Sequence, residues 1–592
     1  MNKLIYIFCF FCCFVSFSQN EELAKDYFDR GEFQKALISY QKLYEEKKGN
    51  INYFIKIVEI HQQLEQLDIA EQLLLDMVEK SRNPQHLVDL GYNYHLKNEE
   101  EKAQDYYNQA LLKIDENPVY GYYVAYRFET HALIDLAAKA YERTMELRPE
   151  ANYHIQLARI YGEQGAIEKM FTSYVNFVER NNSFANQVKR YFNDYISESS
   201  EDENNAILRK VLLKKIQEQP NVIWNQLLSW LFVQQRDYAK AFAQEKAIYK
   251  REQESLRGII DLANLTLEED MPEISADILM YLIETAIDIE TIVDSHKNLL
   301  ELQTKHATKE EYKAIDEKYN NVINTFENNP EIVDIKVSYA HFKAFYLNKP
   351  DEAISYLKTA LEGKFNRFQL AKIKLELGDI LVYQEKFNEA LIYYSQIQTS
   401  LKNSTISQEA RFKVAKASYY KGDFKWAESQ LKILKASTSQ LIANDALDLK
   451  LLISDNKFED STQTALKLYA KADLYAYQNK TDEAISLLDK ILEEHKTESI
   501  IDQALYKQGK LFEGKKDYLK AEANYKAIID NYREDILADD AYYALAELYV
   551  NVLNKPEEAQ ALYEKIIFNH ADSIYFVEAR KKFRALRGDE IN

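Results

Sequence analysis

Small and bulky residues recur along this chain with a period of thirty-four. Counted from a proline, the eighth and twentieth places are small and the twenty-fourth is a tyrosine, first as Gly91, Ala103 and Tyr107 after Pro84, then as Ala125, Ala137 and Tyr141 after Pro118. Self-similarity at a fixed period in this range indicates a repeat architecture. We expect each repeat to be two antiparallel helices, whose small residues let the backbones approach while the tyrosines fill the space beside them.

Such hairpins stack into a solenoid, which lets a chain of 592 residues grow without one oversized core. The chain holds only 13 glycines and 8 prolines, and we place the prolines between repeats or at the first position of a second helix. The predicted fold is all-α, a right-handed superhelix of helix-turn-helix repeats. We divide it into residues 1–18 (signal peptide), 19–184 (first array), 185–330 (divergent repeats and a joint) and 331–592 (second array with a capping helix), and leave open whether the arrays form one superhelix.

The pattern resembles the tetratricopeptide (TPR) repeat over nearly the whole mature chain. Towards the C-terminus, Ile528–Tyr532 followed by Asp539–Ala546 resembles the repeats of bacterial envelope TPR proteins, which act in outer-membrane assembly and cell-wall coordination. In that family a proline usually follows the tyrosine, whereas Arg533 stands here. The resemblance implies a scaffold that binds protein or peptide segments in a groove.

The resemblance also implies that certain places of each first helix face that groove. In this sequence those places hold mainly tyrosine, which combines a large apolar ring with a polar tip and is common on binding surfaces. The predicted groove residues are Tyr92, His95, Tyr122, Tyr126, Arg159, Tyr419, Tyr420, Tyr469, Tyr477, Tyr506 and Tyr543. Packing inside a repeat is the alternative for each of them, since tyrosine also fills the core here.

The N-terminus predicts export. Lys3 supplies a positive charge, Leu4–Phe17 is apolar, and small residues at Ser16 and Ser18 favour signal-peptide cleavage after Ser18. The apolar run is shorter than the roughly twenty residues of a membrane-spanning helix, so we expect no membrane span after cleavage, with an uncleaved anchor as the alternative. All 3 cysteines precede this cleavage site, which removes thiol chemistry and disulfides from the mature chain. We expect a periplasmic or outer-membrane-associated protein.

The formal charge of −20 makes nucleic acid a poor partner, because phosphate binding relies on lysine and arginine. An acidic surface favours a basic partner, with solubility as the alternative reason for the acidity. The ten histidines are scattered and no motif points to a metal, a cofactor or catalysis. We therefore predict a non-catalytic scaffold. The alternatives are an envelope enzyme or carbohydrate-handling protein, which would need converging carboxylates, and a structural spacer in a secretion or motility assembly. The sequence leaves the oligomeric state open.

Overall fold

The computed structural model describes residues 20–47, 49–81, 83–434, 439–457 and 463–589, and every regular element in these ranges is helical. The predicted signal peptide, its cleavage site and the cysteines lie outside the described residues. Contacts divide the chain into two compact units, the first ending at Asp237 and the second beginning at Tyr238. The predicted boundaries at 184 and 330 concern the regularity of the repeats and stay a prediction.

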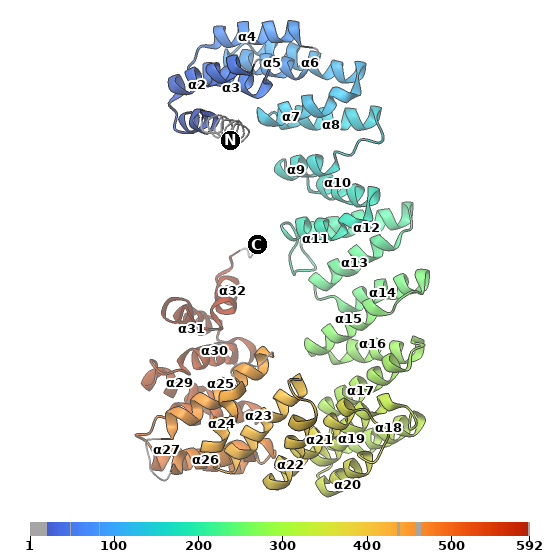
Figure 1. Cartoon of the computed structure of the whole chain (residues 1–592), viewed down its shortest axis with the longest axis vertical. Helices are drawn as coiled ribbons and strands as arrows, with labels where there is room; N and C mark the ends of the chain where they lie inside the picture. The colour runs from blue at the N-terminus through green and yellow to red at the C-terminus, as the bar shows by residue number, and fades with distance from the viewer. Residues whose placement is uncertain (1–19, 48, 82, 435–438, 458–462, 590–592) are drawn as a thin grey trace, which may run out of the picture. The chain divides into compact units, whose positions relative to one another are not determined.

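In the first unit, residues 20–29 are helical. They are followed by α2 (Phe33–Glu46), α3 (Ile51–Gln63), α4 (Leu67–Lys80), α5 (Gln85–Leu96), α6 (Glu100–Glu116), α7 (Gly121–Thr130), α8 (Ile134–Leu147), α9 (His154–Glu163), α10 (Ile167–Arg180), α11 (Ala185–Asn193), α12 (Glu203–Glu218) and α13 (Val222–Gln234). Consecutive helices pair as hairpins that stack on their neighbours, as an α-solenoid requires (Figure 1).

The second unit continues the same plan. Its helices are α14 (Tyr238–Glu252), α15 (Arg257–Glu268), α16 (Pro272–Thr285), α17 (Ile289–His306), α18 (Tyr312–Thr325), α19 (Val333–His341), α20 (Pro350–Ala360), α21 (Arg367–Tyr383), α22 (Phe387–Ser400), α23 (Thr405–Tyr420), α24 (Phe424–Leu434), α25 (Gln440–Asn456), α26 (Thr464–Tyr477), α27 (Thr481–Glu494), α28 (Ile501–Gly514), α29 (Tyr518–Asn531), α30 (Ala538–Leu548), α31 (Pro556–Asn569) and α32 (Phe576–Arg587). Two π-helical turns, Phe342–Tyr346 and Tyr549–Leu553, extend α19 and α30. Pro272, Pro350 and Pro556 each begin a second helix, as predicted.

The spacing of the hairpin turns along the chain gives the length of the repeats. In the first unit, residues with positive φ stand in the hairpin turns at positions 31, 65, 98, 132 and 165, which are 33 or 34 residues apart. In the second unit positions 348, 385 and 422 are 37 residues apart, and so are 479 and 516. The predicted period of thirty-four therefore holds from position 31 to position 165, and the repeats at 348–422 and 479–516 are longer. The first helices account for part of the difference, since α5 has 12 residues and α21 has 17.

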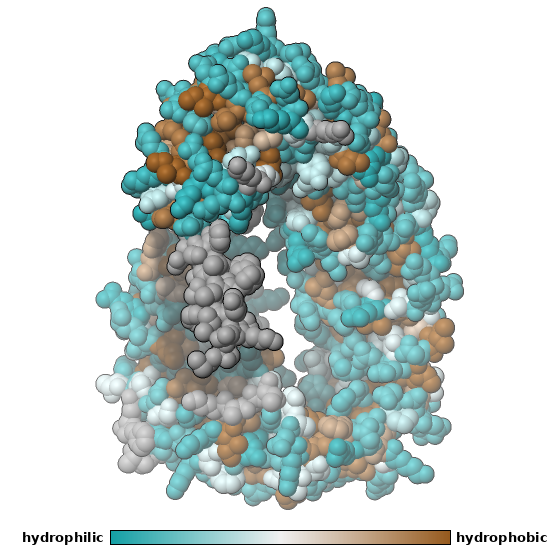
Figure 2. Space-filling view, turned by 45° about the horizontal axis from the view of Figure 1, so that its top comes forward, coloured by the Kyte–Doolittle hydropathy of each residue, from teal (hydrophilic) through white to brown (hydrophobic). Residues whose placement is uncertain are grey.

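The hydrophobic core is local rather than central. In the second unit, clusters of buried residues span Val293–Phe342, Val333–Leu474, Ala415–Ala541 and Ile485–Ala579, so that each overlaps the next along the chain. Nearest-neighbour stacking of this kind is how solenoids gain stability. Hydrophilic residues cover most of the face in Figure 2, and the hydrophobic residues on it form separate groups. The apolar side chains thus serve mainly to join one helix to the next.

Candidate functional site

The predicted groove residues of the first unit lie on α5, α7 and α9. Tyr122 and Tyr126 are 41% and 54% exposed, and their rings stack with centroids 6.0 Å apart. Tyr92 is half-buried and stacks on His131, with ring centroids 4.0 Å apart. His95 is exposed and forms a 2.6 Å hydrogen bond with Glu100. The structure therefore leaves Tyr122 and Tyr126 open to a partner.

Arg159 is the remaining predicted residue of this unit. Its guanidinium is exposed and forms an ion pair with Glu129 on α7, the helix that carries Tyr122 and Tyr126. The pair links consecutive first helices, α7 and α9, on the side where the tyrosines are exposed.

The predicted residues of the second unit differ in accessibility. Tyr419 and Tyr469 are 0% and 8% exposed and belong to one core cluster, so a partner cannot reach them in this structure. The physical reason is that α25 and α26 pack against α23, which carries Tyr419. The others are half-buried: Tyr420, Tyr477, Tyr506 and Tyr543. Whether these tyrosines bind a partner stays a prediction.

A half-buried charge network joins three helices of the second unit. The carboxylate of Asp473 accepts hydrogen bonds from Lys416 (2.7 Å) and Lys507 (2.6 Å), which lie on the helices to either side, α23 and α28. Burial alone would raise the pKa of Asp473, but the two ammonium groups outweigh it and lower the pKa to about 2. The network therefore ties three first helices together.

This network predicts acid sensitivity of the second unit. A carboxyl whose folded pKa is depressed stabilises the fold above its unfolded value of 3.8, and this contribution disappears as pH falls towards about 2. We expect Asp473→Asn to remove about 2 kcal/mol of stability at pH 7 and to flatten the loss of stability between those pH values. Urea unfolding at a series of pH values measures it. Asp482→Asn, which removes an exposed pair with Lys515, is the control, and an equal effect of both would contradict the prediction.

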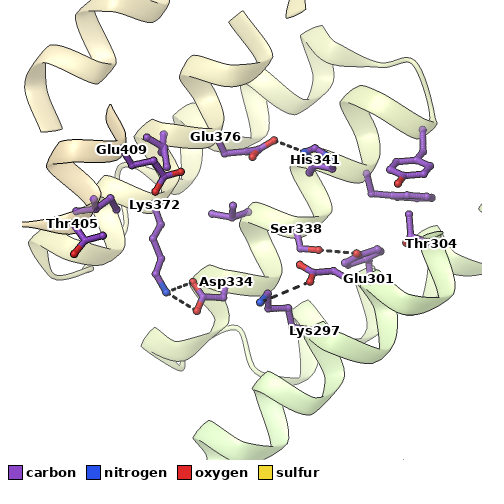
Figure 3. Close-up of a pocket in the computed structure, with 16 residues that line it drawn as sticks. Lys297, Glu301, Thr304, Asp334, Ser338, His341, Lys372, Glu376, Thr405 and Glu409 are labelled. Carbon is purple, nitrogen blue, oxygen red and sulfur yellow. Dashed lines mark hydrogen bonds and ion pairs between the residues drawn. The ribbon is translucent and has the colours of Figure 1, made fainter. Parts of the chain in front are cut away.

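One well-formed pocket among the described residues was not predicted from the sequence. It encloses about 740 Å³ and lies among α17, α18, α19, the π-helical turn, α21 and α23. Polar groups enter it from several helices, among them Glu301, Asp334, Glu376 and Glu409 (Figure 3). The segment 185–330, predicted from the sequence to hold divergent repeats and a joint, contributes α17 and α18 to its wall.

The π-helical turn shapes one side of the pocket. The Leu347 amide donates to the Phe342 carbonyl, five residues back, and π-turns are frequent at functional sites. His341, directly before this turn, shares a 3.0 Å hydrogen bond between its Nδ1 and Oε1 of Glu376 on α21. Its ring also stacks on Phe345, with centroids 4.3 Å apart. The imidazole is thus fixed in orientation at the pocket wall.

The polar groups of the pocket are mostly paired within it. Asp334 accepts from Lys372 at 2.7 Å, the hydroxyl groups of Tyr319 and Ser338 are 2.9 Å apart, and Lys297 lies 3.8 Å from Glu301 (Figure 3). Burial raises the pKa of Glu376, against the opposing effect of His341. Burial opposes protonation of His341, but its hydrogen bond to Glu376 and nearby carboxylates raise the pKa of the imidazole. The hydrogen bond between His341 and Glu376 therefore couples the charges of these two groups at the pocket wall.

One sequence signal could have indicated this pocket. Lys372 and Glu376 are four residues apart on α21, which places two charged residues of the pocket on one face of a first helix. The groove places implied by the family resemblance, which hold mainly tyrosine, do not include these residues. Among the described residues, no group of three or more His, Cys, Asp or Glu side chains could hold a metal ion. None of the helices within the described ranges is long and apolar enough to span a membrane.

With the hairpins and the pocket established, comparison with known proteins identifies the class of repeat. Two family models described as tetratricopeptide repeat match residues 469–536 and 540–573. These two segments of the second unit therefore match tetratricopeptide repeats, the repeat class that the sequence pattern predicts for them. No curated protein sequence matches this chain.

Among solved structures, the chain is similar to a protein in "Structure of Naa15/Naa10 bound to HypK-THB". The identity is 12%, the TM-score is 0.29, and the match covers 97% of this chain and 94% of that one. A second similar chain comes from "Crystal structure of APC/C hetero-tetramer Cut9-Hcn1". Here the identity is 11%, the TM-score is 0.22, and 95% of each chain is covered.

Proposed function

We propose that this protein is a non-catalytic scaffold of the bacterial cell envelope, which binds segments of partner proteins along the first helices of its hairpins. The observation that carries the proposal is the pocket of about 740 Å³, whose walls include the consecutive first helices α19, α21 and α23. The tetratricopeptide repeats in residues 469–573 support a protein-binding function. The signal-peptide pattern of residues 1–18 supports export, and the formal charge of −20 favours a basic polypeptide over nucleic acid.

Site-specific photo-crosslinking tests this proposal. Thr405 is exposed at the pocket on α23, whereas Glu389 is exposed on the second helix α22 and does not line the pocket. A photo-reactive residue at position 405 is expected to capture a polypeptide from envelope extract, and the same residue at position 389 is not. Capture at neither position, or equally at both, would contradict binding at the pocket.

A separate experiment tests the proposed location in the cell envelope. The mature protein is expected to begin at Gln19 and to sediment or release with the envelope fraction, which mass spectrometry of the fractionated cells measures. An intact N-terminus beginning at Met1 on a chain recovered with the cytoplasm would refute this part of the proposal while leaving the binding function intact.

A specific observation favours one alternative. The pocket brings Glu301, Asp334, Glu376 and Glu409 together, and converging carboxylates are what an enzyme or a carbohydrate-handling protein on this frame would need. Under that alternative, position 405 would capture no polypeptide, and turnover of a polysaccharide would be lost in Glu376→Gln. Under the scaffold proposal, polypeptide capture at position 405 occurs without turnover.

A further inference from the structure

We infer that the pocket formed by α17, α19, α21 and α23 receives the side chain of a lysine or arginine from the partner polypeptide. The inference rests on the proposed function, because it names the chemistry of the partner at that site. The shape and lining of the cavity, its charge balance and a second cavity that continues it support this inference.

The lining of the pocket is amphipathic in the same way as a lysine or arginine side chain. Val337, Phe342, Leu375 and Ile406 supply apolar surface on α19, the π-helical turn, α21 and α23. Carboxylates of Glu301, Glu376 and Glu409 come from three different helices and lie around one central space (Figure 3). Long basic side chains bury an apolar stem and keep a charged head, so they match both parts of this lining.

The charge balance of the pocket favours a cation. Four carboxylates line it against the ammonium groups of Lys297 and Lys372, with His341 as the remaining ionisable base. Lys372 is held on Asp334, and Lys297 lies by Glu301. Glu409 has its closest ammonium, that of Lys413, at 3.9 Å, beyond hydrogen-bond distance, and its side chain is 42% exposed. Glu409 is therefore the carboxylate best placed to receive an added cation.

A second cavity continues the acidic surface. It encloses about 230 Å³ beside α15, α16 and α17 and shares Asp334 with the first pocket. Glu290, Asp294 and Glu331 line it, and no lysine or arginine is among the described residues of its wall. The two cavities together present seven carboxylates and two lysines, and all of these residues belong to the second unit. An extended segment with several basic residues can therefore occupy both cavities at once.

Other ligand classes fit the pocket less well. A phosphate or carboxylate ligand would meet like charges, which disfavour its approach. A purely apolar side chain would shield Glu409 from water while its closest ammonium, that of Lys413, stays beyond hydrogen-bond distance, and such desolvation is costly for a charged group. Of these ligand classes, only one with a positive charge on an apolar stem matches both the apolar walls and the carboxylates.

The test uses the full mature chain and a defined probe, a fluorescein-labelled heptapeptide of alternating glycine and lysine. Binding is measured by fluorescence anisotropy, with the acetyl-lysine version of the same peptide as the uncharged control. The lysine peptide is expected to bind at least ten times more tightly than the acetyl-lysine peptide. Equal binding of both peptides would overturn the inference, because acetylation keeps the stem and removes the charge.

A matched pair of variants separates the pocket from the general acidity of the chain. Glu376→Gln/Glu409→Gln removes two pocket charges, and Glu362→Gln/Glu389→Gln removes two exposed charges that do not line it. The pocket pair is expected to weaken lysine-peptide binding at least tenfold and the surface pair less than twofold. Equal weakening by the two pairs would overturn the inference. Glu409→Gln alone, at a part-exposed position that should not affect folding, is expected to weaken binding about threefold by loss of one favourable charge contact.

The two proposals fail differently. If position 405 captures a polypeptide whose binding is unaffected by Glu376→Gln/Glu409→Gln, the scaffold function stands and the basic-side-chain inference is wrong. If the lysine peptide binds through the two glutamates but position 405 captures no polypeptide, the pocket chemistry stands and the proposed scaffold function is wrong.

Discussion

Asp89→Asn is expected to lower the stability of the first unit by about 3 to 5 kcal/mol, because it leaves a buried guanidinium without its main counter-charge. Asp89 is 2% exposed and Arg127 is 7% exposed. Oδ1 of Asp89 accepts from Nε of Arg127 and lies 2.9 Å from Nε2 of His131, while Oδ2 lies 3.3 Å from Nδ1 of His86. After the substitution, the next carboxylate for Arg127 is Glu59, 3.9 Å away.

The pKa of Asp89 reports the same interactions. Burial on its own would raise the pKa of this carboxyl, but Arg127 and the hydrogen bonds from His131 and His86 hold it well below its usual range. Asp89 therefore stays ionised at neutral and mildly acidic pH. Its contribution to stability is present above the ordinary pKa of an aspartate and is lost only in strong acid.

Hydrogen exchange of the backbone amides of α5 and α7 is the appropriate measurement, because repeat proteins open locally. Asp68→Asn is the control: its side chain is 89% exposed, its ion pair with Lys97 lies at the surface, and we expect a loss below about 1 kcal/mol. The double variant Asp89→Asn/Arg127→Gln should recover part of the loss, since no unpaired charge remains. Similar small losses for Asp89→Asn and Asp68→Asn would show that the network is energetically neutral.

The network also explains a predicted groove residue. Tyr92 stacks on His131, and His131 contacts Asp89, so the orientation of Tyr92 depends on a buried charge that sequence periodicity does not reveal. The position of Tyr92 in the repeat predicts its place on a first helix. The same reasoning does not separate Tyr92 from Tyr419, which occupies an equivalent kind of position and is fully buried.

The helical hairpins could be predicted because their signal is local and repeated. Small residues at fixed places, prolines at the first position of α16, α20 and α31, and a glycine in the left-handed turn at Gly31 each have a direct structural cause. Many other turns use residues such as Glu65, Ala132, Glu385 and Lys516 at positive φ. Glycine alone therefore finds only some of the turns, and packing of the flanking helices holds the rest.

The charge spacing on α21 indicates part of one wall, but the pocket as a whole could not be predicted, because its residues are distant in sequence and the helical register at one wall is irregular. Lys297 and Glu409 lie more than one hundred residues apart, and their meeting depends on how α17, α19, α21 and α23 stack. The π-helical turn after His341 inserts one residue into the helical register. Places counted along a regular helix therefore no longer identify the side chains that face the groove beyond it.

Gly378→Val is expected to destabilise the second unit by about 3 kcal/mol, because overpacking a well-filled site forces side chains and backbone to move. A Cβ on Gly378 would lie well within 3.0 Å of the ring of Tyr394, which is 1% exposed and donates a 2.6 Å hydrogen bond to Asp379. The same relation joins Gly91 to Tyr107 and Gly509 to Tyr525, always across sixteen residues, so this close approach is a property of the repeat itself.

Gly514→Val provides the matched control for this prediction. Gly514 is the last residue of α28 and does not have a positive φ, and a Cβ added to it would meet no described atom within 4 Å, so we expect a change below about 0.5 kcal/mol. Hydrogen exchange of α21 and α22 measures the first variant, and that of α28 and α29 the second. Tyr394→Ala in the Gly378→Val background should restore little, because it replaces the clash by a cavity. Equal stability of the two glycine variants would show that the small residue at this place of the repeat is not required for close helix packing.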